Sequence, residues 1–481
     1  MIESPLLEHI QGYVDGAWTG TGEGIAVHNP ATGETLAEVP AMDRGEAVRA
    51  IEAAEAALGQ PASLAQRGEW LKRIAQVLVE NKREIGRILT LEHGKPWSEA
   101  EGEVEYGAGF FHYCGEHVEL LRSHTLEEKP RGCTWTVHYR PAGVAGLITP
   151  WNFPLGMIAK KLSAALAADC PSVIKPSSKT PLTMIALFHL LDRELDLPPG
   201  KVNLVMGPAG PISDALLEHP AVRVISFTGS TEVGKELIRK SAPEVKRLTL
   251  ELGGNAPFLV FEDADLDRTA DNLLLNKFRG GGQTCVCSNR VFVQRTIAAE
   301  FADKLAERAA RLKVGNGLEE GTDIGPLIDR KGYEKVRHHL LDALEKGAER
   351  VTGEDPGEWN KARGTFFPPT VLRGVTPGMA CSIEETFGPL VPIMEFDDEA
   401  EAVRLANATE FGLAAYVFTA DAERAERVIA GMRFAHVGHN TGTGPTPEAP
   451  FGGMKQSGFG REGGREGLFE FVEPQTVPRG E

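Results

Sequence analysis

Residues 144–175, VAGLITPWNFPLGMIAKKLSAALAADCPSVIK, contain the pattern that decides the fold class. The apolar run at 144–148 predicts a buried strand, residues 155–168 have the apolar periodicity of a helix, and a second apolar run at 172–174 predicts another strand. A helix between two short buried strands is the unit from which parallel sheets are built. The stretch therefore predicts a parallel α/β sheet.

The same alternation continues along the chain. Further strands are predicted at 202–205, 222–227 and 246–252, with helices at 181–195, 210–218 and 231–241. Such a sheet is covered by helices on both faces and binds ligands beyond the carboxyl ends of its strands. A second α/β pattern runs from 254 to 434, with helices near 264–278, 297–312 and 330–347 and strands near 291, 390 and 415. Upstream, residues 1–40 predict short strands, and 43–58, 66–91 and 96–119 predict helices.

The composition of the 481-residue chain excludes several classes of protein. A net charge of −17 would repel a nucleic-acid backbone from most of the surface. No segment approaches the ~18 uninterrupted apolar residues of a membrane helix. The first residues, MIESPLLEHIQG, have the character of neither a signal nor a transit peptide, so we expect a cytoplasmic protein. Six cysteines are too few for a disulfide framework, and none has the spacing of a metal site.

Polar residues follow the first two strands of this sheet. Asn152 lies in TPWNFP (149–154), where the alternative is a structural role as the N-cap of a helix that begins with proline. After the next strand, KPSSKTP (175–181) provides an ammonium and two hydroxyls at a helix start, which suit a phosphate or ribose hydroxyls.

The fourth strand ends in FTGSTEVGK (227–235), where Gly229 and Gly234 lie around a helix N-terminus that favours a pyrophosphate. The glycine spacing is also that of an ATPase P-loop, but Glu236 stands where the magnesium-binding Ser or Thr is required. An ATPase is therefore disfavoured, and the motif by itself is weak evidence for any nucleotide.

Two carboxylates stand out near the ends of later strands. Glu251 lies within LTLELGGNAP (248–257), in apolar surroundings that disfavour its charged form and prepare it for proton transfer, although a structural ion pair is the alternative. Farther along, EETFGP (384–389) places a carboxylate and an aromatic ring before a tight turn.

Cys285 lies in FRGGGQTCVCSNR (278–290), directly after a glycine-rich turn and before an apolar run at 291–293. Glycines allow close approach of the backbone to a ligand and positive φ angles. Backbone N–H groups at such a junction are free to donate to a reacting atom, so we predict that Cys285 is a nucleophile. A small buried hydrophobic side chain is the interpretation for the other isolated cysteines, namely Cys114, Cys133, Cys170 and Cys381.

The chain resembles the NAD(P)-dependent aldehyde dehydrogenase family over essentially its whole length. The resemblance rests on five motifs that occur in the same order in that family: PWNFP, FTGS, LELGG, GQTC and EETFGP. The resemblance implies that Cys285 is the nucleophile, that Glu251 is the general base, and that the Asn152 side-chain amide and the Cys285 N–H bind the oxyanion. The residues that it places against the cofactor, NADP or NAD, are Trp151, Lys175, Ser178, Gly229, Ser230, Leu252, Glu385 and Phe387.

The same resemblance implies two Rossmann-like parallel-sheet domains and a small β oligomerisation element. We expect residues 1–120 and 140–253 to form the cofactor-binding domain and 254–440 the catalytic domain, with 441–464 as a return segment. Residues 121–139, a predicted hairpin, and 465–481, where LFEFVE alternates like a strand, are expected to form the oligomerisation element of a homodimer or homotetramer.

Within the family, the FRGGGQTCVCSNR motif is most similar to succinate-semialdehyde dehydrogenases. That similarity implies that Arg279, together with Lys160, binds a substrate carboxylate, because a guanidinium offers a planar fork for it; a surface arginine is the alternative. The subgroup usually has Arg-Lys where Lys160-Lys161 stands, and serines in the loop 441–448, so ketoglutarate semialdehyde or a general small aldehyde are alternative substrates.

Ser178 occupies a position where many NAD-preferring members have a glutamate that would repel a 2′-phosphate, so we expect NADP to be accepted, with NAD as well. The other classes considered are a cysteine hydrolase, which would use the same thiol without a nicotinamide, and a binding protein without catalysis. Cys287, two residues beyond Cys285, suggests a reversible Cys285–Cys287 bridge if the thiolate has a low pKa; a packed cysteine is the alternative.

Overall fold

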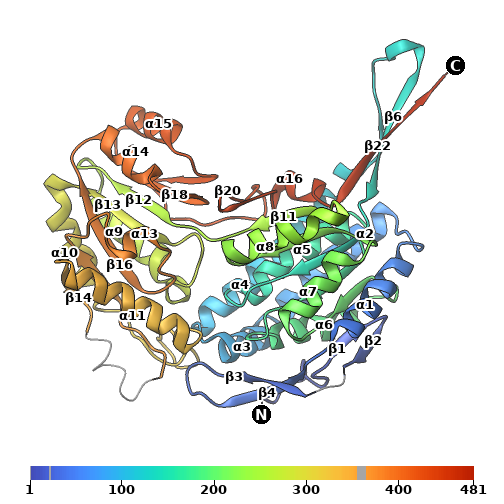
Figure 1. Ribbon diagram of the computed structural model, residues 1–481, viewed down its shortest axis with the longest axis horizontal. Coiled ribbons are helices and arrows are strands. Elements are labelled where there is room, and N and C mark those ends of the chain that lie inside the picture. Colours follow the sequence, from blue (N-terminus) through green and yellow to red (C-terminus); the bar gives the residue numbers. More distant parts are fainter. Residues whose placement is uncertain (1, 21–22, 355–363, 481) are drawn as a thin grey trace.

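The computed structural model describes residues 2–20, 23–354 and 364–480 of the chain (Figure 1). Residues 1 and 481, the outer limits of two predicted segments, lie outside the described residues. The architecture is an α/β fold with two large, mainly parallel sheets and a separate three-stranded sheet. The predicted fold class is therefore confirmed.

The first large sheet contains the strands predicted from the alternating segment. Five central strands run parallel, and antiparallel strands extend both edges. In order across the sheet they are β2 (Ala17–Thr19), β1 (Gly12–Val14), β9 (Val202–Leu204), β8 (Ser172–Lys175), β7 (Val144–Ile148), β10 (Val222–Thr228), β11 (Arg247–Glu251) and β21 (Gly458–Phe459). The edge strand β21 returns from the C-terminal part of the chain and pairs with β11 at Glu251.

Helices cover both faces of this sheet, as the periodicity predicts. One face packs against α1 (Arg44–Ala57), α7 (Ala209–Glu218) and α8 (Thr231–Ser241). The other packs against α2 (Leu64–Glu80), α3 (Lys82–His93), α4 (Trp97–His117), α5 (Pro154–Ala167) and α6 (Leu182–Glu194). Each face has its own buried apolar cluster, so the sheet is the centre of a three-layer unit.

The second large sheet is built in the same way. Its strands, in order, are β14 (Glu349–Thr352), β15 (Thr370–Arg373), β16 (Leu390–Phe396), β13 (Ser288–Gln294), β12 (Ala256–Val260), β18 (Ala414–Phe418) and β19 (His436–His439). All neighbours are parallel except β14 and β15. On one face lie α9 (Leu266–Phe278) and α10 (Ala298–Ala309), and on the other α11 (Arg330–Glu345), α13 (Ala380–Ile383), α14 (Glu399–Asn407) and α15 (Ala422–Gly431).

The third sheet joins segments far apart in the sequence. β6 (Thr134–Pro141) pairs antiparallel along its whole length with β22 (Val472–Arg479), and β5 (His124–Thr125) pairs with the other edge of β6. Figure 1 shows β6 and β22 extending away from the rest of the chain near the C-terminus. Two short pairs complete the strands: β3 (Gly24–His28) with β4 (Thr35–Pro40), and β17 (Phe411–Gly412) with β20 (Met454–Lys455).

Two predicted elements are wrong in detail. The single helix expected at 66–91 is interrupted at Asn81, whose side-chain amide donates to the Val77 carbonyl at 2.8 Å and so ends α2 before α3 begins. The expected strand over LFEFVE starts late, because Leu468 belongs to the short helix α16 (Gly464–Phe469) and packs into the core. None of the described helices combines the length and apolar character needed to span a bilayer.

Candidate active site

The cysteine-bearing turn has the strained backbone that its glycines predict. In the 3₁₀ turn η4 (Arg279–Gly282), Gly280, Gly281 and Gly282 have φ angles of 59°, 66° and 76°. A β-carbon on Gly282 would lie 2.3 Å from the Gly388 carbonyl oxygen, so only glycine fits against the neighbouring loop. The turn holds Cys285, which follows it, half-buried at the wall of a cavity.

Burial raises the pKa of the Cys285 thiol to about 12, with a further upward contribution from Glu385. The Cys285–Cys287 bridge stays a prediction, which rests on the proximity of the two thiols in the sequence and not on a low pKa of the resting Cys285 thiol. Cys287 itself is buried, and its thiol donates to the Gly282 carbonyl at 3.3 Å.

Asn152 lies beside the loop that carries Cys285. Its side-chain amide donates to the Gln283 carbonyl at 3.1 Å, two residues before Cys285. Its amide oxygen is buried and has no hydrogen-bond partner among the described residues. The alternative role as an N-cap is wrong, because α5 begins at Pro154 with Phe153 in the cap position and no side-chain cap. Asn152 is thus held by the catalytic loop instead of by the helix.

Glu251, the last residue of β11, is buried, and neither carboxylate oxygen has a hydrogen-bond partner among the described residues. Burial, and then the charge of Glu462, raise its pKa well above the ordinary value. The alternative of a structural ion pair is therefore not supported, since a paired carboxylate would have its oxygens occupied. A buried, unpaired carboxyl group with a raised pKa suits proton transfer.

A buried charged group lies near Glu251. It consists of two neighbouring lysines and of one glutamate that comes from the C-terminal segment. Lys161 makes an ion pair with Glu462 and hydrogen bonds to Ser226 at 3.2 Å, and Lys160 lies 4.0 Å from the same carboxylate. Burial alone would lower the pKa of Lys160, but its interactions with Tyr106, Glu462 and Glu251 raise it above the ordinary value. Lys160 is therefore a fixed positive charge within the site.

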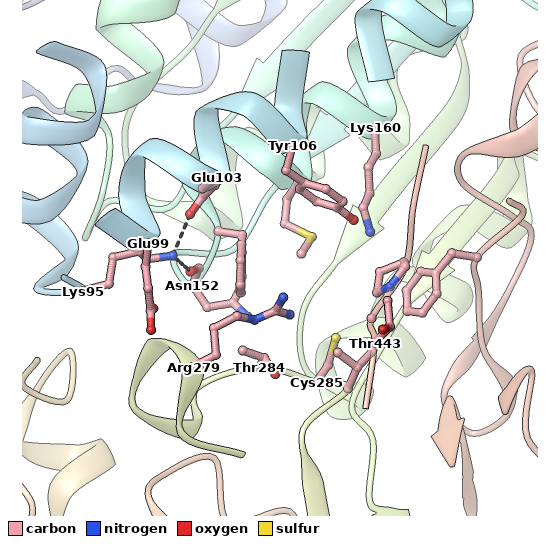
Figure 2. Close-up of a pocket in the computed structure, with 17 residues that line it drawn as sticks. Lys95, Glu99, Glu103, Tyr106, Asn152, Lys160, Arg279, Thr284, Cys285 and Thr443 are labelled. Carbon is pink, nitrogen blue, oxygen red and sulfur yellow. Dashed lines mark hydrogen bonds and ion pairs between the residues drawn. The ribbon is translucent and has the colours of Figure 1, made fainter. Parts of the chain in front are cut away.

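A cavity of about 330 Å³ brings four of the predicted site residues together: Cys285, Asn152, Arg279 and Lys160. Figure 2 shows Arg279 and Lys160 extending into the space beside Cys285. The Arg279 guanidinium lies 5.5 Å from the ring centroid of Phe153 and makes no ion pair within the described part of the chain. An unpaired guanidinium that lines the same cavity as Cys285 favours an anionic ligand.

Residues of α4 that sequence reasoning missed line the same cavity. Glu99, Glu103 and Tyr106 are spaced by four and then three residues, so they occupy one face of the helix. Glu103 makes a buried ion pair with Lys95 at 2.6 Å, and Glu99 accepts from the Gly280 N–H at 2.8 Å. The signal that would have found them is a pair of acidic residues on a largely buried helical face.

The predicted cofactor residues lie at the strand ends of the first sheet and in the facing loop of the second. Trp151 and Phe387 make an edge-to-face contact at 5.6 Å, and Phe387 has a φ of 57°. The Glu385 carboxylate accepts from the Gly254 N–H at 3.2 Å, and burial raises its pKa to about 7. Leu252 packs so tightly against Gly234 that a β-carbon there would lie 2.6 Å from its side chain.

Three further residues of this group can meet an anionic cofactor. Lys175, at the end of β8, is buried, makes no ion pair or side-chain hydrogen bond within the described residues, and has a pKa lowered by burial to about 8. Ser178 donates to the Gly207 carbonyl at 3.4 Å. Ser230 is the N-cap of α8 and follows Gly229, where a β-carbon would lie 2.3 Å from the Phe227 ring. An unpaired buried ammonium near a helix N-terminus fits the phosphates of NAD(P).

The fold and this site define a class: an α/β protein with a thiol at the wall of a cavity, a buried carboxyl group and polar side chains at the strand ends. A sequence profile described as "Aldehyde dehydrogenase family" matches residues 18–477. The chain belongs to the aldehyde dehydrogenase family. It is an NAD(P)-dependent oxidoreductase, as the sequence motifs imply.

Relatives with a described activity cover nearly the whole chain. The chain is 45% identical to a glutarate-semialdehyde dehydrogenase of Pseudomonas aeruginosa, with 96% of each chain covered. It is 45% identical to a 3-sulfolactaldehyde dehydrogenase of Pseudomonas putida, over 99% of this chain and 98% of the relative. It is 44% identical to an NADP(+) succinate-semialdehyde dehydrogenase of Escherichia coli, with 96% of each covered.

Solved structures agree with the fold. An oxidoreductase from Marinobacter aquaeolei is 63% identical, with a TM-score of 0.98 and 100% of both chains covered. A succinate-semialdehyde dehydrogenase from Burkholderia pseudomallei is 44% identical, with a TM-score of 0.97 and 100% of both chains covered.

Proposed function

We propose that the protein oxidises a semialdehyde with a distal carboxylate, such as succinate semialdehyde, to the corresponding acid, with NADP or NAD as the hydride acceptor. The observation that carries the proposal is the Arg279 guanidinium, which lines the cavity of Cys285 and makes no ion pair within the described residues. Each of the three relatives compared above is named for an aldehyde that carries a second, anionic group.

In this proposal, the Cys285 sulfur adds to the aldehyde carbon, and the Asn152 amide and Cys285 N–H stabilise the negative oxygen. Because the pKa of Cys285 is raised by burial, the thiol needs a proton acceptor before it adds. Glu251 is an unpaired carboxyl group whose charge acts on Cys285, and we assign it that role. NAD(P), when bound, supplies the hydride acceptor. Glu251 must then release the thiol proton to solvent before it acts again. Its carboxylate takes a proton from the water that releases the acid from the sulfur, and the Cys285 thiol is restored with that proton.

For the cofactor, we propose that NADP is accepted and that NAD is used as well. Ser178 presents no negative charge to a 2′-phosphate, and the nearby Lys179 is exposed although it pairs with Asp329. Lys175 supplies an unpaired ammonium at the same strand end.

The location and the assembly are also proposals. All six cysteines are free thiols, which fits the reducing cytoplasm. β22 is mostly exposed and β6 is only partly buried along a paired ribbon that extends from the chain, which fits a role in a homodimer or homotetramer. The domain limits predicted from the sequence would then assign this ribbon to the oligomerisation element.

A kcat/KM series tests the substrate assignment. Succinate semialdehyde, a ketoglutarate semialdehyde and uncharged butanal are each assayed with NADP and NAD, in the wild type and in Arg279→Ala. We expect the carboxylated substrates to be preferred and to lose about 30-fold in the variant, because a hydrogen bond between charged groups is worth about 2 kcal/mol.

Arg268→Ala is the matched control, because Arg268 is an exposed arginine on α9 outside the cavity. Equal efficiency with butanal, together with an unchanged Arg279→Ala variant, would replace the proposal with a general aldehyde dehydrogenase. A preference for NAD over NADP above about a thousandfold, which corresponds to ~4 kcal/mol, would overturn the cofactor assignment.

A further inference from the structure

The polar groups of the 330 Å³ cavity divide into those already engaged and those left without a partner. Lys95 is engaged by Glu103 and by the Asn152 carbonyl at 2.9 Å, and Glu103 also accepts from the N–H groups of Leu155 and Gly156. These groups are satisfied within the protein, so they are not free to bind a ligand.

Tyr106 is different. Its hydroxyl is buried and meets no partner at normal hydrogen-bond geometry among the described residues. The Lys160 ammonium is the group that interacts with it most strongly, and because an ammonium only donates, the phenolic O–H is still free to donate to a ligand. Asn152 and Thr284 also carry unpartnered oxygens in this cavity, but both lie at the nucleophile, where the aldehyde carbon must be. Tyr106 comes from α4, on the wall that carries Glu99 and Glu103. A buried hydroxyl without a partner costs free energy, so its retention in a ligand cavity needs a reason.

The Tyr106 ring is held rigidly in place. It packs edge-to-face against Phe110 with centroids 5.0 Å apart, and a β-carbon on Gly156 would lie 3.2 Å from its edge. The Lys160 ammonium lies 5.7 Å from its centroid. Burial raises the pKa of Tyr106, so the phenol stays a neutral donor across the physiological range.

Tyr106 and Arg279 line the same cavity, and Figure 2 shows Tyr106 extending from above, with its hydroxyl beside the Lys160 ammonium, and Arg279 extending from below. Lys160, and then Arg279, act electrostatically on the Tyr106 hydroxyl, so the phenol lies in a positively charged part of the cavity. An anion held by the guanidinium would accept a second hydrogen bond from the phenol without any rearrangement of the ring.

We infer that the Tyr106 hydroxyl is a specificity-determining donor that binds the distal anion of the substrate together with Arg279. This inference rests on the proposed function and adds a second contact to it. A terminal carboxylate has two oxygens, and a planar guanidinium and a phenol that line one cavity can each reach one. An uncharged aldehyde would leave the phenol unpaired, which disfavours its binding.

The test is Tyr106→Phe, which removes one oxygen and keeps the ring. With succinate semialdehyde we expect KM to rise about tenfold with kcat within twofold, because the lost contact binds ground state and transition state alike. With butanal we expect kcat/KM to be unchanged or raised. In an Arg279→Ala background the effect of Tyr106→Phe should shrink to less than threefold, because the two groups share one anion.

Tyr113→Phe is the matched control: it removes a phenolic hydroxyl from the same helix, outside the cavity, where the ring stacks on His117 at 4.1 Å. An unchanged KM for succinate semialdehyde, or an equal loss with butanal, would overturn the inference. If Tyr106→Phe had the same effect in the Arg279→Ala background as in the wild type, the two residues would contact different groups of the substrate, and the inference would also be wrong. If Arg279→Ala leaves substrate preference unchanged, the proposed function itself fails, so the two failures are distinguishable.

Discussion

The aldehyde cavity and the cofactor side of this active site each contain a positively charged side chain that is paired with a carboxylate and another that is not. The unpaired group is a guanidinium in the cavity and an ammonium on the cofactor side. In the cavity, Lys95 is paired with Glu103, which leaves Arg279 unpaired among the described residues. On the cofactor side, Lys179 is paired with Asp329, which leaves Lys175 unpaired among them. On each side the cation without a protein partner indicates where an anionic ligand binds.

The difference between the two cations lies in how pH affects them. A guanidinium keeps its charge throughout the physiological range. Burial lowers the pKa of Lys175 to about 8, so its ammonium is charged below that pH and neutral above it. Cofactor binding should therefore weaken as pH rises through 8, whereas recognition of the substrate anion should not. In the proposed mechanism Glu251 acts in the reaction itself and binds neither the substrate anion nor the cofactor.

Glu251→Gln should have the largest effect. The amide keeps the shape of the side chain but does not accept a proton, so we expect kcat to fall about 10²- to 10⁴-fold. The loss should be equal for every aldehyde and for both cofactors, and stopped-flow absorbance at 340 nm measures it. If the loss were confined to one aldehyde or to one cofactor, Glu251 would contribute to the binding of that ligand, and the distinction between the two binding sides and the reaction centre would be wrong.

The pH profile of kcat sharpens the same prediction. Because burial and Glu462 raise the pKa of Glu251, its basic form is present only above that raised value. In the wild type, kcat should therefore rise with pH through the Glu251 pKa, and this limb should disappear in Glu251→Gln. A variant that keeps the limb would assign the base to another group.

Lys175→Met should have an intermediate effect on activity. It removes the unpaired cation of the cofactor side, as Arg279→Ala removes that of the aldehyde cavity. We expect KM for NADP to rise about tenfold, from the loss of a charge-assisted hydrogen bond, with the preference among aldehydes unchanged. The wild-type KM for NADP should rise with pH above 8, and the variant should lack this dependence. Lys240→Met, which removes an exposed lysine of α8 that is paired with Asp214 and Glu236, is the control. An altered aldehyde preference would contradict the comparison.

Cys287→Ala should have the smallest effect on turnover, within about twofold, because its thiol contacts the Gly282 carbonyl and lines neither ligand site. Its predicted role is recovery from oxidation, since a peroxide that removes two electrons from the Cys285 and Cys287 thiols yields their disulfide and water. Dithiothreitol should restore the activity of the oxidised wild type and less of the variant's. Equal recovery in both would exclude the bridge.

The sequence by itself determined both parallel sheets and most residues that meet in the active site. Apolar runs such as 144–148 and helical periodicity are local properties, and the glycine-rich turn before Cys285 has a local conformational requirement that only glycine meets. Parallel strands then bring their carboxyl ends to one edge of the sheet, which is why Lys175 and Glu251 at the ends of strands, and Asn152 shortly after one, lie along the same edge.

Only the tertiary structure decided which charges are paired. The contact of Lys161 with Glu462 spans 301 residues, and no periodicity in the sequence predicts it. The same holds for Asn152: its local sequence fits an N-cap, but its side-chain amide donates to the Gln283 carbonyl. It also holds for Tyr106, because the sequence does not distinguish it from the other aromatic residues of α4, and only the folded structure shows that its buried hydroxyl lacks a partner at normal hydrogen-bond geometry among the described residues. Motifs follow from local chemistry, whereas pairing and burial depend on which distant segments pack together.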